Sequence, residues 1–396
     1  MKNKLIIPSI LFAMMTCAAD GMNTHDNNND NGGANNSLTS AVMPIGQTPQ
    51  WQKVRMENNR GDYVTIPSYW SRVEGGGLIL YREVRTVLFD SKPETIDSSE
   101  FENSSITHIT IPDSVKKIGG HAFFNCISLK IVSFGLHPQL TVIGYGAFCY
   151  ISIEKIIIPS SVKEIGNGAF QNCKSLKTVE FKPGSKLQVI GKMAFGESSI
   201  EKITIPSSVE KIEDGAFNVC EQLTDVRFEP NSQLLVIGDG AFYNISIEKI
   251  IIPSSVIKIG STAFRNCQLL ETVEFESGSK LQVIGESAFD STALTSITIL
   301  DSVKEIGSYA FFNCKSLKTV RFGLNPQLTV IGGSAFIITA LTSITIPSSV
   351  KEIGNWAFTN CLNLKTVIFL VNPESIMIGR EAFSSAVNKV YNANQP

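Results

Sequence analysis

Hydrophobic positions recur along the chain with a period of 47 residues, which is the signature of a repeat architecture. Phe residues, each preceded by Ala, are separated alternately by 25 and 22 residues from Phe123 to Phe383. Each period therefore contains two coils, and a degenerate coil around Phe101 brings the expected total to 13. Cysteines and glycines follow the same period at Cys126, Cys173, Cys220, Cys267, Cys314 and Cys361, and at Gly144, Gly191, Gly238, Gly285, Gly332 and Gly379.

The sequence of a single coil predicts how the chain folds within it. Apolar residues alternate with exposed positions over 153–158, which predicts a strand with Ile156 and Ile158 facing inward. Pro159 has no N–H group and ends the strand. After Val162 and Ile165 turn inward, Gly166 is expected to supply a turn with positive φ.

The coil then closes through a corner. Ala169-Phe170 predicts a short helical or irregular turn, with the Phe ring filling the interior and the small Ala admitting the next coil. Asn172 is expected to hydrogen-bond the exposed backbone of this turn, and Cys173 to pack beside it. Asn125, Asn266, Asn313 and Asn360 share the slot, whereas Val219 departs from it.

A coil of this size cannot bury its own apolar face, so the coils must stack into a solenoid. We expect a right-handed, β-rich leucine-rich-repeat solenoid with short helical turns and a parallel concave sheet of about 13 coils. Strands about 4.8 Å apart would give it a length of about 60 Å.

The repeated sequence resembles the BspA-type leucine-rich repeats of bacterial surface proteins. The segment Leu341 to Phe358 shows the pattern Leu-x-x-Ile-x-Ile-Pro-x-Ser-Val-x-x-Ile-Gly-x-x-Ala-Phe, and related sequence extends from Val84 to Phe383. The resemblance implies adhesion to host matrix glycoproteins, host cells or other bacteria. The repeat physics alone implies only a large, regular surface.

The remaining segments predict an exported protein. Residues 1–19 combine Lys2 and Lys4 with an apolar run over Leu5–Met15, which is typical of a signal peptide. Two interpretations stay open: a lipoprotein signal with Cys17 as the lipidated residue, or ordinary cleavage near Ala18-Ala19 and free secretion. Residues 20–40 are expected to form a flexible Asn/Asp-rich tether, 41–83 a β-rich N-terminal cap, and 84–396 the solenoid with a closing strand at 387–391.

Composition and motifs argue against catalysis. The net charge of −2 gives no electrostatic case for nucleic acid, and any membrane contact is expected only through the N-terminal lipid. Equivalent cysteines lie two coils apart, about 9.6 Å, too far for disulfides, so we interpret them as small buried residues. Cys149 lies off the period, and a bridge to Cys126 stays an alternative. The four histidines complete no triad or metal set, and we expect no enzyme, metal or cofactor.

The expected binding surface is the exposed face of the strands. Its outward positions include charges that alternate in sign, at Glu180, Arg227, Glu274 and Arg321. Between them lie Ile157, Thr204, Ile251 and Thr298. Two interpretations stay open: these residues are good strand formers that keep the face soluble, or the face binds a ligand.

The functional hypothesis is an exported cell-surface protein that binds an extracellular protein or glycan. The alternative is a structural or interaction protein of the cell envelope with bacterial partners only.

Overall fold

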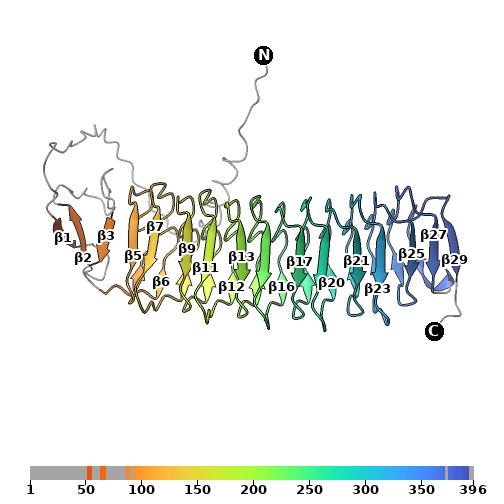
Figure 1. The fold of residues 1–396 in the computed structure, drawn as a ribbon, viewed down its shortest axis with the longest axis horizontal. Coiled ribbons are helices and arrows are strands. Elements are labelled where there is room, and N and C mark those ends of the chain that lie inside the picture. The colour runs from red at the N-terminus through yellow and green to blue at the C-terminus, as the bar shows by residue number, and fades with distance from the viewer. Residues whose placement is uncertain (1–50, 56–62, 68–85, 90–91, 371–372, 392–396) are drawn as a thin grey trace, which may run out of the picture.

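The computed structural model describes residues 51–55, 63–67, 86–89, 92–370 and 373–391. They form an elongated solenoid whose coils follow one another from the N-terminal to the C-terminal end (Figure 1). A typical coil has a strand of four residues on one side and a strand of two residues on the other. The predicted repeat solenoid is confirmed.

The strands of four or five residues comprise an N-terminal pair and one strand from each successive coil. They are β1 (Trp51–Arg55), β2 (Tyr63–Pro67), β3 (Thr86–Phe89), β5 (His108–Ile111), β7 (Ile131–Phe134), β9 (Lys155–Ile158), β11 (Thr178–Phe181), β13 (Lys202–Ile205), β15 (Asp225–Phe228), β17 (Lys249–Ile252), β19 (Thr272–Phe275), β21 (Ser296–Ile299), β23 (Thr319–Phe322), β25 (Ser343–Ile346), β27 (Thr366–Phe369) and β29 (Asn388–Tyr391).

The two-residue strands alternate with these along the chain. They are β4 (Thr95–Ile96), β6 (Lys117–Ile118), β8 (Val142–Ile143), β10 (Glu164–Ile165), β12 (Val189–Ile190), β14 (Lys211–Ile212), β16 (Val236–Ile237), β18 (Lys258–Ile259), β20 (Val283–Ile284), β22 (Glu305–Ile306), β24 (Val330–Ile331), β26 (Glu352–Ile353) and β28 (Met377–Ile378). Among the described residues the one helix is η1 (Pro373–Ser375), so the Ala-Phe corners are hydrogen-bonded turns rather than helices.

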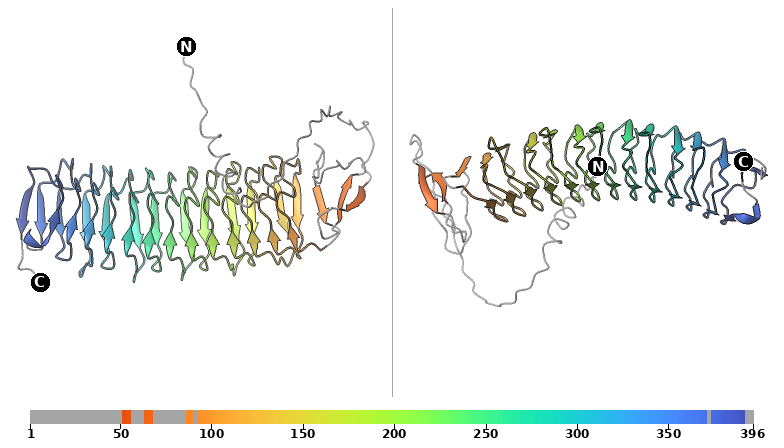
Figure 2. Two further views of the ribbon diagram at one scale, coloured as in Figure 1. Left: turned by 180° about the vertical axis from the view of Figure 1, so that it is seen from behind. Right: turned by 90° about the horizontal axis from the view of Figure 1, so that it is seen from below.

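The two sides of the solenoid differ in continuity. The short strands form one uninterrupted parallel sheet of 13 strands, whereas the longer strands are divided among several smaller sheets. Breaks separate β7 from β9, β15 from β17, β19 from β21 and β23 from β25. The rod is only slightly bowed (Figure 2), so we name its sides the long-strand face and the short-strand face.

The interior is a ladder of Phe rings, one from each coil. All twelve neighbouring pairs from Phe101 to Phe383 are stacked, with centroids 4.9–5.5 Å apart and planes within 11°. Ala169 and its equivalents are fully buried beside the rings, as predicted. This ladder packs the solenoid from Phe101 to Phe383, because each ring between the two ends contacts both of its neighbours.

The role of the repeat glycines differs from the predicted one, which was to supply a turn with positive φ. Gly166 does not adopt positive φ; a Cβ there would lie 2.9 Å from the carbonyl carbon of Gly144 in the preceding coil. The glycine is therefore needed for close approach between coils. Positive φ falls instead two positions before and two positions after the ladder Phe, as at Gly168 and Asn172 around Phe170.

This geometry also explains the Asn slot. Asn125, Asn172, Asn266, Asn313 and Asn360 all have φ between 55° and 61°, a conformation that Asn tolerates better than most residues. Four of these side chains bond the side chain in the equivalent slot of the preceding coil, as in Asn125 Nδ2 to Asn103 Oδ1 at 2.7 Å. These four link coil to coil through side chains, and the expected bond to the turn backbone was wrong.

Val219 is a strained member of this slot, because it is β-branched and has φ 56°. We expect Val219→Asn to raise the free energy of unfolding by about 1 kcal/mol, the order of the cost of a left-handed residue. Chemical denaturation followed by circular dichroism measures the change. Asn266→Val is the reciprocal control and should lower stability; unchanged stability in both variants would refute the explanation.

Both ends of the long-strand face are extended by further strands. β1 and β2 pair antiparallel with each other, β2 pairs antiparallel with β3, and β3 pairs parallel with β5. At the other end β29, over nearly the residues predicted to form a closing strand, pairs parallel with β27. The assignment of 41–83 as a cap stays a prediction, because most of that segment lies outside the described residues.

Candidate binding surfaces

The eight residues predicted to bind lie in one row on the long-strand face, and all are exposed. The register places them in four adjacent pairs: Ile157–Glu180, Thr204–Arg227, Ile251–Glu274 and Thr298–Arg321. The row is geometrically as predicted, and its role in binding stays a prediction.

Most charges in this row are paired with charged neighbours on the same face. Lys155 Nζ lies 2.6 Å from Glu180 Oε1, and Lys249 Nζ lies 2.6 Å from Glu274 Oε1. Arg227 pairs with Asp225 on its own strand, at 2.8 Å. Among the described residues Arg321 has no ion-pair partner. The alternating signs are thus largely neutralised within the face, and such exposed pairs add little stability.

The long-strand face is hollowed where its sheet is broken. Between β15 and β17 a hollow of about 390 Å³ is lined by Asp225, Val226, Arg227, Phe228, Lys249, Ile251 and Glu276. A second, of about 360 Å³, lies at the break between β7 and β9. The first hollow brings together Arg227 and Ile251, two of the predicted residues, from different sheets.

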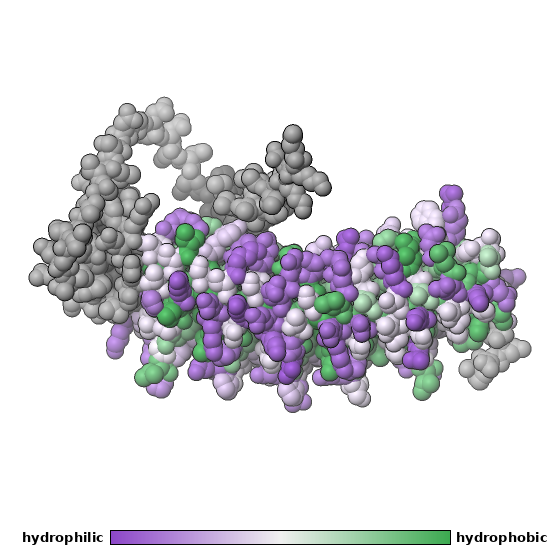
Figure 3. All heavy atoms as spheres, turned by 45° about the horizontal axis from the view of Figure 1, so that its top comes forward, coloured by the Kyte–Doolittle hydropathy of each residue, from purple (hydrophilic) through white to green (hydrophobic). Residues whose placement is uncertain are grey.

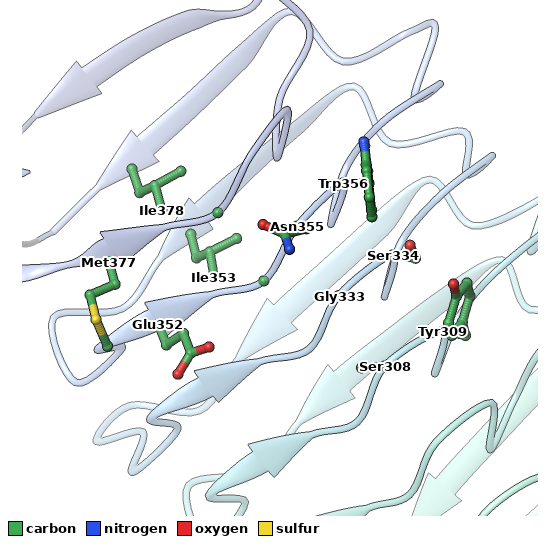
Figure 4. A pocket seen from close by; sticks show the side chains of 12 residues that line it. Ser308, Tyr309, Gly333, Ser334, Glu352, Ile353, Asn355, Trp356, Met377 and Ile378 are labelled. Atoms are coloured by element: carbon green, nitrogen blue, oxygen red, sulfur yellow. The ribbon is translucent and has the colours of Figure 1, made fainter.

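Two larger hollows lie at the corners that carry the Ala-Phe turns, which we call the turn edge. One, of about 910 Å³, extends over the coils from Tyr145 to Arg265. The other, of about 420 Å³, includes Tyr309 and Trp356 (Figure 4). Sequence reasoning missed this edge, although one signal was available: the position two before the ladder Phe varies between Gly and large side chains.

The periodic cysteines are buried free thiols, which confirms their interpretation as small packed residues. Cys173 Sγ donates to the carbonyl oxygen of Phe148 at 3.1 Å, and its equivalents make the same bond to the preceding coil. Cys149 is also buried, and neither it nor Cys126 forms a disulfide, so the alternative bridge between them is wrong. Burial raises the pKa of Cys173 and Cys267 to about 12, and that of Cys220 and Cys314 to about 11.

These shifts predict a loss of stability at alkaline pH. A folded-state pKa above the unfolded value of 9.0 favours folding while the thiol is neutral, and this contribution is lost as pH rises from about 9 to about 12. Urea midpoints should fall across this window, and less steeply in a Cys173→Ala/Cys267→Ala variant. Equal slopes for the two proteins would show that the thiols do not control the decline.

The described histidines occupy different parts of the solenoid. His108 Nδ1 lies 2.8 Å from Thr107 Oγ1 at the start of β5, whereas His121 lies on the turn edge between the Phe124 and Tyr145 rings. Burial lowers the pKa of His121, and the nearby Glu102 partly offsets this shift. Within the described residues no group of three His, Cys, Asp or Glu side chains could hold a metal ion.

Comparison with known proteins agrees with the repeat. The family model described as the BspA type leucine rich repeat region matches residues 94–224, 188–318, 235–366 and 282–394, which together span most of the chain. The chain belongs to the BspA-type leucine-rich repeat family. This is a family of repeat solenoids rather than an enzyme family. No curated protein sequence matches the chain.

Three solved structures are similar to this BspA-type chain, and the first, with a TM-score above 0.5, shares its fold. A leucine-rich repeat protein from Bacteroides ovatus has a TM-score of 0.56 and 21% identity, covering 81% of this chain and 97% of its own. A leucine-rich cell surface protein from Faecalibacterium prausnitzii gives 0.40 and 21%, covering 89% and 97%. The pneumococcal vaccine antigen PcpA gives 0.43 and 21%, covering 88% and 89%.

The predicted export signal, Cys17 and the tether lie outside the described residues. Across the part of the chain that the structure describes, no helix has the length and apolar character needed to cross a membrane.

Proposed function

We propose that this BspA-type protein is exported to the cell surface and binds an extracellular protein through the long-strand face, centred on the hollow between β15 and β17. The observation that carries the proposal is that this hollow unites Arg227 and Ile251, which sequence reasoning selected independently of any cavity. The family membership and the signal-like N-terminus support an extracellular location.

The chemistry of the hollow suits a protein partner. Ile251 is 46% exposed at its rim, Phe228 is half-buried against the core, and Arg227 stands 72% exposed beside them. Arginine and large apolar groups beside a pocket are typical of the residues that dominate protein–protein binding. The surrounding ion pairs would form a polar rim.

The side of the molecule drawn in Figure 3 favours a localised contact over general hydrophobic adhesion. Figure 3 shows one side of the molecule, on which hydrophilic side chains predominate and hydrophobic ones form small separate patches. The neighbouring strands are held by the continuous ladder of stacked rings, so the hollow needs little ordering on binding, which favours affinity.

Surface plasmon resonance of the purified chain against immobilised extracellular-matrix proteins, and separately against envelope proteins of the producing bacterium, tests this proposal. We expect a matrix protein to bind, and Arg227→Glu with Ile251→Asp to weaken its binding at least tenfold. Thr298→Asp with Arg321→Glu is the matched control on the intact β21–β23 sheet and should bind nearly normally. An equal loss of affinity in both variants would show that binding uses the whole row of outward residues and not the hollow. Binding only to envelope proteins would favour the alternative function, a cell-envelope protein with bacterial partners.

Anchoring is a separate part of the proposal. If Cys17 is lipidated, Cys17→Ala should release the protein from the membrane fraction into the medium. Unchanged membrane association would rule out the lipid anchor while leaving the binding surface untouched.

A further inference from the structure

The position two before each ladder Phe has positive φ throughout the solenoid. Glycine, which adopts this conformation without steric cost, fills it at Gly146, Gly168, Gly215 and Gly240. The other coils carry non-glycine residues there, among them His121 and Met193, and two coils carry the largest aromatic side chains, Tyr309 with φ 58° and Trp356 with φ 57°. A bulky residue with positive φ is an outlier that carries a conformational cost, and such outliers cluster at functional sites.

Both rings project from the turn edge into solvent. Tyr309 is 42% exposed and Trp356 is 40% exposed, so neither is explained by packing in the core. They line the same hollow of about 420 Å³, and Figure 4 shows Ser334 between them. Between these two rings the hollow forms a cleft with an aromatic residue on each side and a small residue at its centre, and beyond Trp356 the hollow continues to Met377, Ile378 and Gly379.

The width of the cleft follows from the stacking of the coils. The Phe rings of the same three coils are 5.1 Å apart at each step, so Tyr309 and Trp356 emerge about 10 Å apart. A planar ring stacked between the Tyr309 and Trp356 rings would hold them only about 7 Å apart, because each of its two faces makes a carbon contact of ~3.5 Å. The cleft thus fits a thicker, puckered ring with hydrogens on both faces.

The walls of the cleft are held in place by neighbouring side chains. Trp356 Nε1 donates to Glu381 Oε2 at 3.3 Å, and Glu381 Oε1 accepts from Arg380 Nε at 3.1 Å. Tyr309 packs edge-on against Phe312, with centroids 5.8 Å apart. The indole and the phenol are therefore restrained before a ligand arrives, which lowers the entropic cost of binding.

The rest of the lining mixes polar and apolar groups, and Ile353, Met377 and Ile378 supply the apolar ones. Ser308, Ser334, Glu352 and Asn355 contribute hydroxyl, carboxylate and amide groups. Asn355 Oδ1 accepts from the backbone N–H of Arg380 at 2.7 Å, and its amide nitrogen has no hydrogen bond within the described coils. Apolar ring faces combined with hydrogen-bonding groups match a sugar, which presents C–H groups on its faces and hydroxyl groups around its rim.

We propose that the cleft between Tyr309 and Trp356 binds a pyranose ring of an extracellular glycan. The site lies on the turn edge and shares no residue with the hollow between β15 and β17. A proline-rich peptide also binds aromatic grooves, but it offers few donors for the carboxylate and the hydroxyl groups of this lining.

Saturation-transfer difference NMR of the full chain with cellotetraose and with tetra-N-acetylchitotetraose tests the proposal, with sorbitol as an acyclic comparison. We expect at least one of the two oligosaccharides, and not sorbitol, to receive saturation at its ring C–H protons. Tyr309→Gly with Trp356→Gly should weaken binding at least tenfold. The melting temperature of this variant should equal or exceed that of the wild type, because glycine suits the backbone of this slot.

Two controls make the result specific. Met193→Gly relieves the same backbone conformation in another coil (φ 52°) and should leave sugar binding unchanged, as should Arg227→Glu with Ile251→Asp. Trp356→Phe should retain most of the binding.

Three results would overturn the proposal. The first is an absence of saturation transfer to both oligosaccharides at millimolar concentration, and the second is undiminished transfer in the double glycine variant. The third is displacement of a bound sugar by a proline-rich peptide with higher affinity. None of these outcomes bears on protein binding at the long-strand face.

Discussion

Replacement of Phe217 by alanine should lower the free energy of unfolding by about 3–5 kcal/mol. The ring is fully buried and stacks on both neighbours, with centroids 5.4 Å from Phe195 and 5.3 Å from Phe242. The substitution would remove buried surface, leave a cavity and interrupt the ladder at its centre. Because stability in a solenoid is a sum of coil and interface contributions, two interfaces would weaken together.

Urea denaturation followed by circular dichroism measures this loss. Phe383→Ala is the matched control, because Phe383 stacks on one ladder neighbour only, Phe358, and lies at the less buried end of the solenoid. It should cost clearly less than Phe217→Ala. Similar losses at the two positions would show that stacking along the ladder contributes little beyond local burial.

Gly332→Ala should be the second strongly destabilising change, by about 3 kcal/mol or more, at the upper end of the usual cost of overpacking. A Cβ at this position would lie 2.4 Å from the backbone nitrogen of Ser308 and 2.5 Å from the carbonyl carbon of Gly307. Both atoms belong to the backbone of the preceding coil, so the clash cannot be relieved by a side-chain rotation. The coils would have to separate, at the cost of the interface between them.

Gly278→Ala separates this effect from backbone strain. Gly278 has φ +76°, but a Cβ added there would meet no atom within 4 Å. Alanine at this position should therefore cost only about 1 kcal/mol. Thermal denaturation of the two variants side by side provides the comparison. A larger loss at Gly278 than at Gly332 would mean that φ, and not close approach, determines why the repeat requires glycine.

The repeat made most of the fold predictable from the sequence. Period-two alternation placed Ile156 and Ile158 inside and ended the strand at Pro159, and the structure has β9 end at Ile158. A parallel sheet of about 13 coils was predicted and is present, but the prediction did not assign it to the short strands, because two residues are too few for an alternation to be recognised. The roles of the glycine and Asn positions were misassigned for a related reason. The sequence shows that a position requires one residue type, but not whether a positive φ or a contact with the neighbouring coil causes that requirement.

The candidate surfaces were predictable only in part. The outward positions of Arg227 and Ile251 follow from alternation along one strand. Their meeting in one hollow depends on the break between β15 and β17, which is a relation between coils. The aromatic cleft likewise depends on the distance between alternate coils, because Tyr309 and Trp356 are 47 residues apart in sequence.

Site-specific photo-crosslinking tests binding through the hollow most directly. A photoreactive amino acid at position 251, in the hollow, and in a second protein at position 298, on the intact sheet, would be combined with the matrix protein identified by surface plasmon resonance. We predict strong crosslinking from position 251 and weak crosslinking from position 298. Crosslinking from position 298 alone, or from neither position while the protein still binds, would contradict binding through the hollow of the long-strand face.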